Sequence, residues 1–419
     1  MTARQPFDFP KGFLWGASTS AHQVEGGLSN QWTMWELENA KALSTQAPYQ
    51  FGDVPSWERI QHQARLPSNY VSGKAVNHYE LFCEDIALLK KLHMNAFRFS
   101  IEWSSIQPEE DLWNAGEVAH YRIVLSELHR QGIEPIVTLF HFTLPVWFAR
   151  KGGFEKRRNV RYFVEFAERI MAELGDLVRY VITINEPEVY VWQSYGEARW
   201  PPQKQQKFLA FRVLHNIIYA HNQAAKALHA QRATYQISIA KNSAYVYPGD
   251  DSALSVRAAA IVQYLQDDYL LERVQKQCDF LGVNYYFSDR IYGYRRHNPH
   301  EYLSDLGWDM QPEHIEHVLV RLARKYKKPI IITENGLADA QDSNRKWWLT
   351  QTIVGMQKAI QQGVELKGYL HWSLVDNFEW DKGFWPQFGL AAVDRRTMKR
   401  TLRPSAVWFG RVIKKVRGV

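Results

Sequence analysis

The chain has 419 residues, a formal net charge of +7 and an isoelectric point of about 9.1. Hydrophobic residues make up 46% of it and charged residues 23%, which is typical of a globular protein with a large core and excludes wholesale disorder. The basic residues are dispersed and no motif for DNA or RNA accompanies them, so we expect no nucleic-acid partner.

Cysteine usage and hydropathy indicate the compartment. Cys83 and Cys278 are the only cysteines, too few for a disulfide framework. Residues 1–10 contain no apolar core of signal-peptide length, and no apolar run of about 18 residues, enough to span a bilayer, occurs. We therefore expect a soluble, cytoplasmic protein without membrane partners. The sequence leaves open whether it forms homo-oligomers.

Strand-like and helical segments alternate along the chain. A first strand leads into a polar loop at 19–27, and residues 41–74 carry no sustained period, which indicates a long surface excursion. The predicted strands are 13–18, 95–102, 134–140, 181–186, 236–240, 279–286, 329–334 and 368–374. The predicted helices are 78–93, 118–130, 160–174, 208–230, 252–276, 313–326, 346–361 and 404–415.

Eight strands in alternation with helices favour one parallel sheet closed into a ring. We expect a single (β/α)8 TIM barrel over residues 1–419, forming one catalytic domain with its active site at the carboxyl ends of the strands. An open, doubly wound sheet would also alternate. It would need a glycine-rich phosphate-binding loop after the first strand, and the sequence has none there.

Two of the strands deliver a glutamate at their carboxyl end. In Val181–Pro187, four β-prone residues run into Asn185, Glu186 and a proline that cannot continue the strand. In Pro329–Gly336, an apolar run ends at Glu334, followed by the turn signal Asn-Gly. A ring of parallel strands brings such distant ends to one rim.

Polar, acidic and aromatic residues follow seven of the eight predicted strands. They are Gln23, Arg98, His141, Asn185, Glu186, Asn284, Tyr286, Glu334, Trp372 and Glu379. Two carboxyl groups that flank a site are what glycoside hydrolysis requires, one protonated and one ionised. Two like charges close together split their pKa values, and Arg98 is placed to keep Glu334 ionised.

Five segments resemble the signature blocks of glycoside hydrolase family 1, the β-glucosidase family. They are 13–26, 97–103, 183–187, 333–336 and 371–381, in the order and spacing of the family. The blocks Thr-Ile-Asn-Glu-Pro and Ile-Thr-Glu-Asn-Gly are highly specific when they occur together.

The resemblance implies a retaining exo-β-glycosidase that hydrolyses terminal β-D-glycosyl residues of small glycosides and short oligosaccharides, with no cofactor or metal. β-Galactosidase and β-fucosidase activity would accompany β-glucosidase activity. Glu186 matches the acid/base and Glu334 the nucleophile. Residues matching contacts to the sugar are Gln23, His141, Asn185, Glu379 and Trp380, with Trp372 as the platform under the ring and Asn284 and Tyr286 around the nucleophile.

Two other functions fit the same scaffold. Another retaining barrel glycosidase, such as an endo-glucanase, also presents Asn-Glu-Pro, but Gln23 with Glu379 and Trp380 builds a closed end for one terminal sugar. A catalytically silent carbohydrate-binding protein would be expected to have lost one glutamate, and both are present.

Two departures from the family bear on specificity. Phe142 stands where the family usually has Trp, which removes an indole N–H and predicts relaxed discrimination at one sugar hydroxyl. Relatives that cleave 6-phosphorylated sugars have Ser at the position of Glu379, followed by Lys and Tyr where this chain has Pro386 and Phe388. With a carboxylate and no compensating cation, a non-phosphorylated sugar is favoured.

Overall fold

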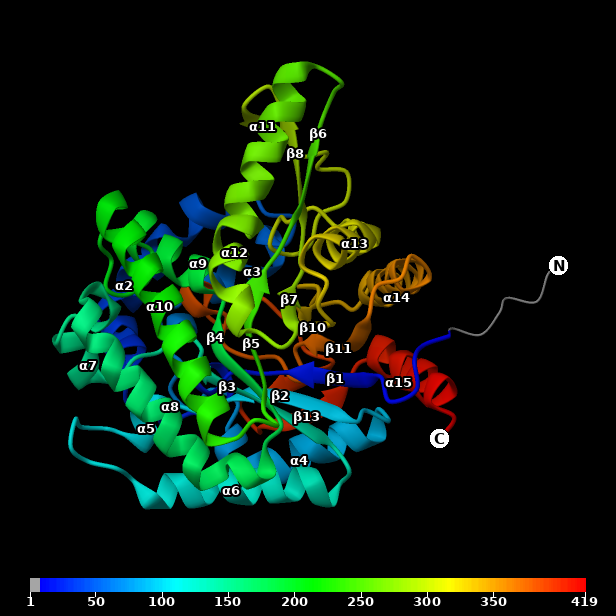
Figure 1. Ribbon diagram of the computed structural model, residues 1–419. Helices are drawn as coiled ribbons and strands as arrows, with labels where there is room; N and C mark the ends of the chain where they lie inside the picture. The colour runs from blue at the N-terminus through cyan, green and yellow to red at the C-terminus, as the bar shows by residue number, and fades with distance from the viewer. Residues whose placement is uncertain (1–7) are drawn as a thin grey trace.

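The computed structural model describes residues 8–419. Eight parallel strands close into a barrel in the order β1-β11-β10-β7-β5-β4-β3-β2, as predicted (Figure 1). The strands are β1 (Leu14–Ser18), β2 (Ala96–Ser100), β3 (Glu134–Phe140), β4 (Tyr180–Asn185), β5 (Gln236–Asn242), β7 (Leu281–Asn284), β10 (Ile330–Asn335) and β11 (Leu366–Trp372). Each overlaps one predicted strand.

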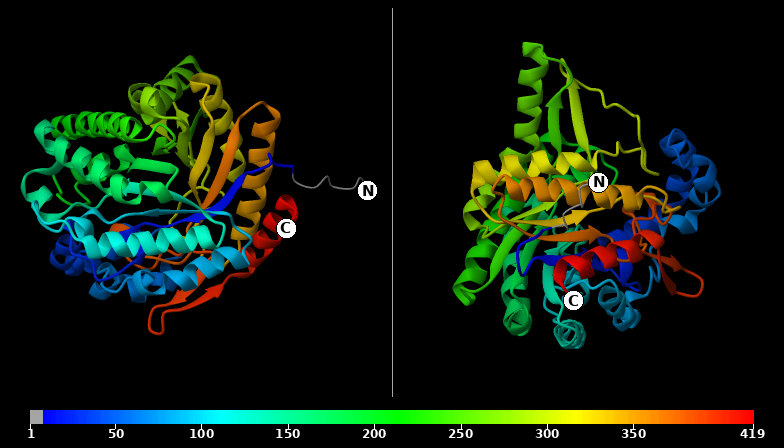
Figure 2. Two further views of the ribbon diagram at one scale, coloured as in Figure 1. Left: turned by 60° about the horizontal axis from the view of Figure 1, so that its bottom comes forward. Right: turned by 90° about the vertical axis from the view of Figure 1, so that its right-hand side faces the viewer.

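Helices surround the strands (Figure 2). They are α4 (His78–Lys91), α6 (Ala115–Arg130), α8 (Val160–Leu174), α10 (Lys207–Gln231), α11 (Ala253–Gln263), α12 (Tyr269–Val274), α13 (Ile315–Tyr326), α14 (Arg345–Gln361) and α15 (Pro404–Arg417). The predicted helix 252–276 is divided by a π-helical turn, η6 (Tyr264–Asp268). The last helix packs back on the first strand through Phe409 and Trp15, with ring centroids 5.9 Å apart.

The barrel strands are apolar because both of their faces are buried. All five residues of β2 and all six of β10 are buried. Side chains such as Leu14, Ile136 and Ile331 pack together in one apolar cluster contributed by several strands.

The prediction for residues 41–74 was wrong. This region contains the second half of a 21-residue helix, α2 (Gln31–Phe51), then α3 (Trp57–Ala64) and a 3-10 turn, η1 (Pro67–Tyr70). The buried positions of α2 follow a helical spacing, but Glu36 and Ser44 are among them and Pro48 lies inside the last turn. These polar residues and the proline hid the apolar period. The predicted loop 19–27 likewise contains a short helix, α1 (Ala21–Val24).

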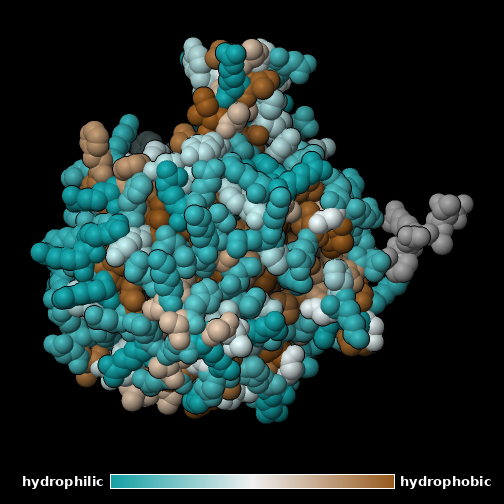
Figure 3. All heavy atoms as spheres, viewed as in Figure 1, coloured by the Kyte–Doolittle hydropathy of each residue, from teal (hydrophilic) through white to brown (hydrophobic). Residues whose placement is uncertain are grey.

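Two small sheets outside the barrel were not predicted. One consists of β6 (Tyr245–Pro248), β8 (Ser288–Tyr292) and β9 (Arg295–Arg296), and with α11 it projects from the barrel (Figure 1). This projection carries hydrophobic surface in Figure 3, and α11 contributes exposed apolar residues that include Leu254 and Ile261. The other is the hairpin β12 (Ala391–Asp394) and β13 (Lys399–Leu402). None of the helices within residues 8–419 combines the length and apolarity that crossing a bilayer requires.

Candidate active site

Glu186 occupies the junction between β4 and the short helix α9 (Pro187–Val191). It has a positive φ of 38° and is the residue before the first turn of α9, where Pro187 begins the helix. Its N–H donates to the carbonyl of Ala240 on the neighbouring strand, at 2.8 Å. This backbone directs the carboxyl group off the end of the sheet, and the residue is 7% exposed.

Glu334 is the second-last residue of β10, and its carboxyl group accepts hydrogen bonds from two donors. Arg98 donates from Nη1 to Oε1 at 2.5 Å, and the hydroxyl of Tyr286 donates to Oε2 at 2.7 Å. Gly336, two residues on, passes so close to β11 that a Cβ there would lie 1.8 Å from the carbonyl oxygen of Trp372. Glycine therefore allows this strand end to pack against the next one.

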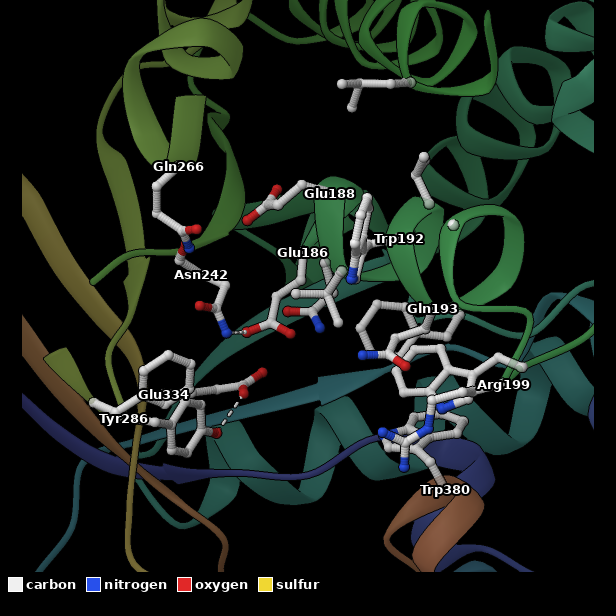
Figure 4. Close-up of a pocket in the computed structure, with 18 of the residues that line it drawn as sticks. Glu186, Glu188, Trp192, Gln193, Arg199, Asn242, Gln266, Tyr286, Glu334 and Trp380 are labelled. Atoms are coloured by element: carbon white, nitrogen blue, oxygen red, sulfur yellow. Dashed lines mark hydrogen bonds between the residues drawn. The ribbon is translucent and has the colours of Figure 1, made fainter. Parts of the chain in front are cut away.

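The two glutamates line one cavity of about 940 Å³, and Figure 4 shows their carboxyl groups facing each other across it. The other predicted site residues that line it are His141, Asn185, Tyr286, Trp372, Glu379 and Trp380. Gln23, Arg98 and Asn284 lie behind this lining and reach it through hydrogen bonds. The structure thus brings together all the side chains predicted for the rim.

The surroundings of the two glutamates separate their pKa values. Burial, reinforced by the charge of Glu334, raises the pKa of Glu186 to about 8. Burial also raises the pKa of Glu334, but the Arg98 guanidinium and the Tyr286 hydroxyl counteract it. Because Arg98 is the only cation among residues 8–419 that contacts the pair, and it lies on Glu334, Glu186 is the group that keeps a proton at neutral pH.

Arg98 orders the side chains between β2 and β4. It is fully buried and donates from Nη2 to Oδ1 of Asn185 at 2.7 Å. The amide nitrogen of Asn185 therefore faces Nε2 of His141, 3.1 Å away, and donates to it. Burial lowers the pKa of His141 well below its usual value, so the ring is neutral with its hydrogen on Nδ1. Among the described residues Nδ1 has no partner, which leaves this donor for a ligand.

Gln23 and Glu379 meet at another wall of the cavity. The Gln23 amide donates to the carbonyl of Phe378 at 2.7 Å and to Oε2 of Glu379 at 3.4 Å. Burial raises the pKa of Glu379 to about 7. Lys382 counteracts this rise and lines the same cavity. The expectation that no cation compensates Glu379 was therefore wrong, although Lys382 also pairs with Asp381 at 3.0 Å.

Aromatic rings form one side of the cavity. The ring of His141 is stacked on both Trp372 and Trp380, with centroids 5.9 and 6.0 Å apart. Phe142 contacts Trp380 edge to face at 5.2 Å and also lines the cavity. Flat indole surfaces beside polar groups suit the apolar faces and hydroxyl edges of a sugar.

Several lining residues were not predicted. Asn242, at the end of β5, donates to Oε1 of Glu186 at 3.0 Å, and Glu188 and Trp192 follow Glu186 on the next helical turns. The available signal was the strand position of Asn242. The predicted strand ended at Ala240, and two more residues would have brought an asparagine to the rim from this fifth strand, the one barrel strand without a predicted site residue.

Comparisons with known proteins agree with this geometry. The model of glycosyl hydrolase family 1 matches residues 5–276 and 265–417. β-Glucosidase A of Thermotoga maritima is 30% identical, over 97% of this chain and 98% of that protein. A solved β-glycosidase from Pyrococcus horikoshii has a TM-score of 0.86 and 34% identity, over 98% of this chain and 96% of that one. The solved β-glucosidase from Thermotoga maritima in complex with glucoimidazole has a TM-score of 0.85 and 29% identity, over 98% of this chain and 99% of that one.

The family match covers both glutamate-bearing strands and nearly all of the chain. The relatives also align over almost their full length, so the likeness extends beyond a shared barrel. The chain belongs to glycosyl hydrolase family 1 and is a glycoside hydrolase of the β-glucosidase type.

Proposed function

We propose that the protein is a retaining exo-β-glucosidase that removes terminal β-D-glucosyl residues through a covalent glycosyl-enzyme. The observation that carries the proposal is the asymmetry of two facing glutamates in one cavity: within the described part of the chain, only Glu334 contacts a cation. Retaining glycosidases use such a pair at a separation of about 5 to 5.5 Å, one carboxyl as nucleophile and the other as acid.

In the first step, a carboxylate oxygen of Glu334 attacks the anomeric carbon as the bond to the leaving oxygen breaks. That oxygen takes the proton of Glu186, and the aglycone departs as an alcohol. Oε1 of Glu186 accepts from the amides of Asn284 and Asn242, at 2.8 and 3.0 Å. Since an amide N–H can only donate, the transferable proton sits on Oε2.

In the second step, Glu186 is ionised and accepts a proton from water. The water oxygen bonds to the anomeric carbon, and the ester bond to Glu334 breaks. Two displacements on one carbon return the β configuration. Arg98 and Tyr286 stabilise the released carboxylate, because both donate to its oxygens.

The sugar is bound by the polar residues of the cavity. We assign Gln23, His141, Asn185, Glu379 and Trp380 to its hydroxyl groups, with Trp372 beneath the ring. The free Nδ1–H of His141 and the carboxyl of Glu379 supply a donor and an acceptor. The relative solved in complex with glucoimidazole supports small glycosides as substrates. We also include β-galactosides and β-fucosides among the proposed substrates.

Azide rescue tests the assignment. The assay compares wild type, Glu186→Ala and Glu334→Ala on 2,4-dinitrophenyl β-glucoside, with and without azide. Each variant should lose about 10²-fold or more in activity. Azide should restore Glu186→Ala and yield the β-azide, because the glycosyl-enzyme still forms. It should yield the α-azide with Glu334→Ala.

The product configurations separate this proposal from its alternatives. Inversion by the wild type would contradict the retaining mechanism. A folded wild type that binds glucose analogues without turning over any glycoside would favour a silent binding protein.

Both cysteines are free, and we propose a reducing, cytoplasmic location on that ground.

A further inference from the structure

A fully buried lysine lies beside the proposed acid/base. Lys241 is on β5, and its ammonium group contacts Oε1 of Glu188 at 2.5 Å and the main-chain carbonyl of Asn242. Oδ1 of Asp267, from η6, lies 3.5 Å away, and Arg321 of α13 pairs with the same carboxylate. A buried ammonium needs such compensation, and here it ties β5 to α9 and η6.

Glu188 brings a second carboxyl close to Glu186. It lies two residues later on α9 and lines the cavity, and Figure 4 shows it beside Glu186 on the side of Asn242 and Gln266. After burial and Glu334, the charge of Glu188 contributes to raising the pKa of Glu186. A negative neighbour makes ionisation of Glu186 harder.

Asn242 acts on the same carboxyl group in the opposite sense. Its amide nitrogen donates to Oε1 of Glu186 at 3.0 Å, and this contact lowers the pKa of Glu186. A donated hydrogen bond is stronger to a carboxylate than to a carboxylic acid, so it favours the ionised form.

Lys241 holds both neighbours at once, Glu188 through an ion pair and Asn242 through its carbonyl. Other charged or titratable groups around Glu186 are Glu334 with Arg98 behind it, Tyr286, His141, Glu379 and Asp267. Apart from Glu334, none of these groups is among those that shift the pKa of Glu186 most strongly.

We propose that Glu188 and Asn242 are positioning residues that oppose each other in setting how firmly Glu186 holds its proton, with Lys241 fixing both. The inference rests on the proposed function, in which Glu186 is the acid. A firmly held proton serves the first displacement, and a carboxylate that forms readily serves the second. Two opposed neighbours keep Glu186 between these demands.

The pH dependence of kcat/KM tests this, because its basic limb reports the acid of the free enzyme. Glu188→Gln removes a like charge, so Glu186 should lose its proton more easily and the basic limb should move to lower pH. Asn242→Ala removes a donor to the carboxylate, so the limb should move to higher pH. Each shift should be about half a pH unit or more.

Leaving groups provide a second readout. Methyl β-glucoside needs protonation of its leaving oxygen, whereas 2,4-dinitrophenyl β-glucoside hardly does. Both variants should therefore change kcat/KM for the methyl glycoside more than for the dinitrophenyl one. If the two residues had only a structural role, each variant would change kcat/KM for both substrates by the same factor.

Glu155→Gln is the matched control. Glu155 is also a largely buried glutamate paired with a lysine, Lys204, at 2.7 Å, but it is not among the groups that act most strongly on Glu186. The basic limb of kcat/KM for Glu155→Gln should stay at the pH of the wild-type limb. Limbs that stay fixed in Glu188→Gln and Asn242→Ala, or that move in the same direction, would overturn the inference. Should Glu188→Gln fail to fold by circular dichroism, Asn242→Ala decides alone. A wild type without glycosidase activity would instead refute the proposed function.

Discussion

Glu186 and Glu334 have the same intrinsic acidity in water, and in the folded chain their different hydrogen-bond donors help to distinguish them. Glu334 receives a charged donor, Arg98, and a phenol, Tyr286. Glu186 receives two neutral amides, from Asn242 and Asn284. A charged donor stabilises a carboxylate roughly twice as strongly as a neutral one, so the proton goes to Glu186.

At Phe142 a single side chain is expected to alter sugar preference. Phe142 lines the cavity against Trp380, and Phe142→Trp would add an indole N–H beside the sugar. One hydrogen bond of about 1 kcal/mol favours the matching hydroxyl configuration about fivefold. We expect the ratio of kcat/KM among nitrophenyl β-glucoside, β-galactoside and β-fucoside to change by about that factor.

The control for this change is Phe287→Trp, which adds an indole to the same cavity on the side of Trp308. The ratio of kcat/KM among the three nitrophenyl glycosides should be the same in Phe287→Trp as in wild type. If Phe142→Trp folds with an unchanged melting temperature and leaves the ratio of the three substrates unaltered, relaxed discrimination does not originate at this position.

At the scale of elements, α2 is anchored at its first turn by a capping box. Oδ1 of Asn30 accepts from the N–H of Thr33 at 3.0 Å, and the Thr33 hydroxyl accepts from the N–H of Asn30 at 2.9 Å. The Asn30 amide also contacts the ring of His22, 3.1 Å away. One side chain thus fixes the start of α2 against the segment that carries Gln23.

Asn30→Ala should destabilise the protein by about 1 to 2 kcal/mol, because it removes the cap and leaves buried partners unsatisfied. Urea unfolding followed by circular dichroism measures the loss. Asn30→Ser is the matched variant, since serine can cap the helix but cannot reach His22. It should fall between wild type and Asn30→Ala. Equal stability of all three proteins would show that α2 is held by its packing alone.

The same helix shows where sequence reasoning failed. One of its polar buried residues is stabilised by contacts to other parts of the chain: Glu36 accepts from the hydroxyl of Ser72 and pairs with His22. Such partners are 36 and 14 positions away along the chain, so a local apolar period cannot reveal them. The barrel strands were predictable because full burial on both faces requires an unbroken apolar run.

At the scale of the molecule, the parallel ring made most of the rim predictable. Residues at or just after the carboxyl end of an apolar strand, such as Glu334 and His141, are brought to one end of the barrel whatever their separation in sequence. Contacts between a strand end and the helix that follows its neighbour could not be predicted in this way. Lys241 of β5 and Glu188 of α9 are 53 positions apart and meet because α9 follows β4, which pairs with β5.

The contribution of Glu25 to the stability of the whole molecule should fall as pH rises from about 5 to about 8. Burial raises the pKa of Glu25 to about 8, whereas the ordinary value of a glutamate applies in the unfolded chain. At this site the folded protein therefore binds more protons in this window, which makes unfolding easier as pH increases. Glu186 and Glu379, with pKa values raised to about 8 and about 7, act in the same direction. Histidines whose pKa values are lowered by burial act in the opposite direction: His120, His221 and His371.

Glu25→Gln isolates one of these groups, because Gln does not titrate while Glu186 and Glu379 remain. Glu25 accepts from the Tyr121 hydroxyl at 2.8 Å, and within the described part of the chain its Oε2 has no partner. Between about pH 5 and about pH 7.5 the free energy of unfolding should fall by about 3 kcal/mol less in the variant than in wild type. Urea unfolding at both pH values measures the difference. Equal decreases in the two proteins would mean that Glu25 is ionised when folded, and its unpaired oxygen would then have to be solvated by water reaching the interior.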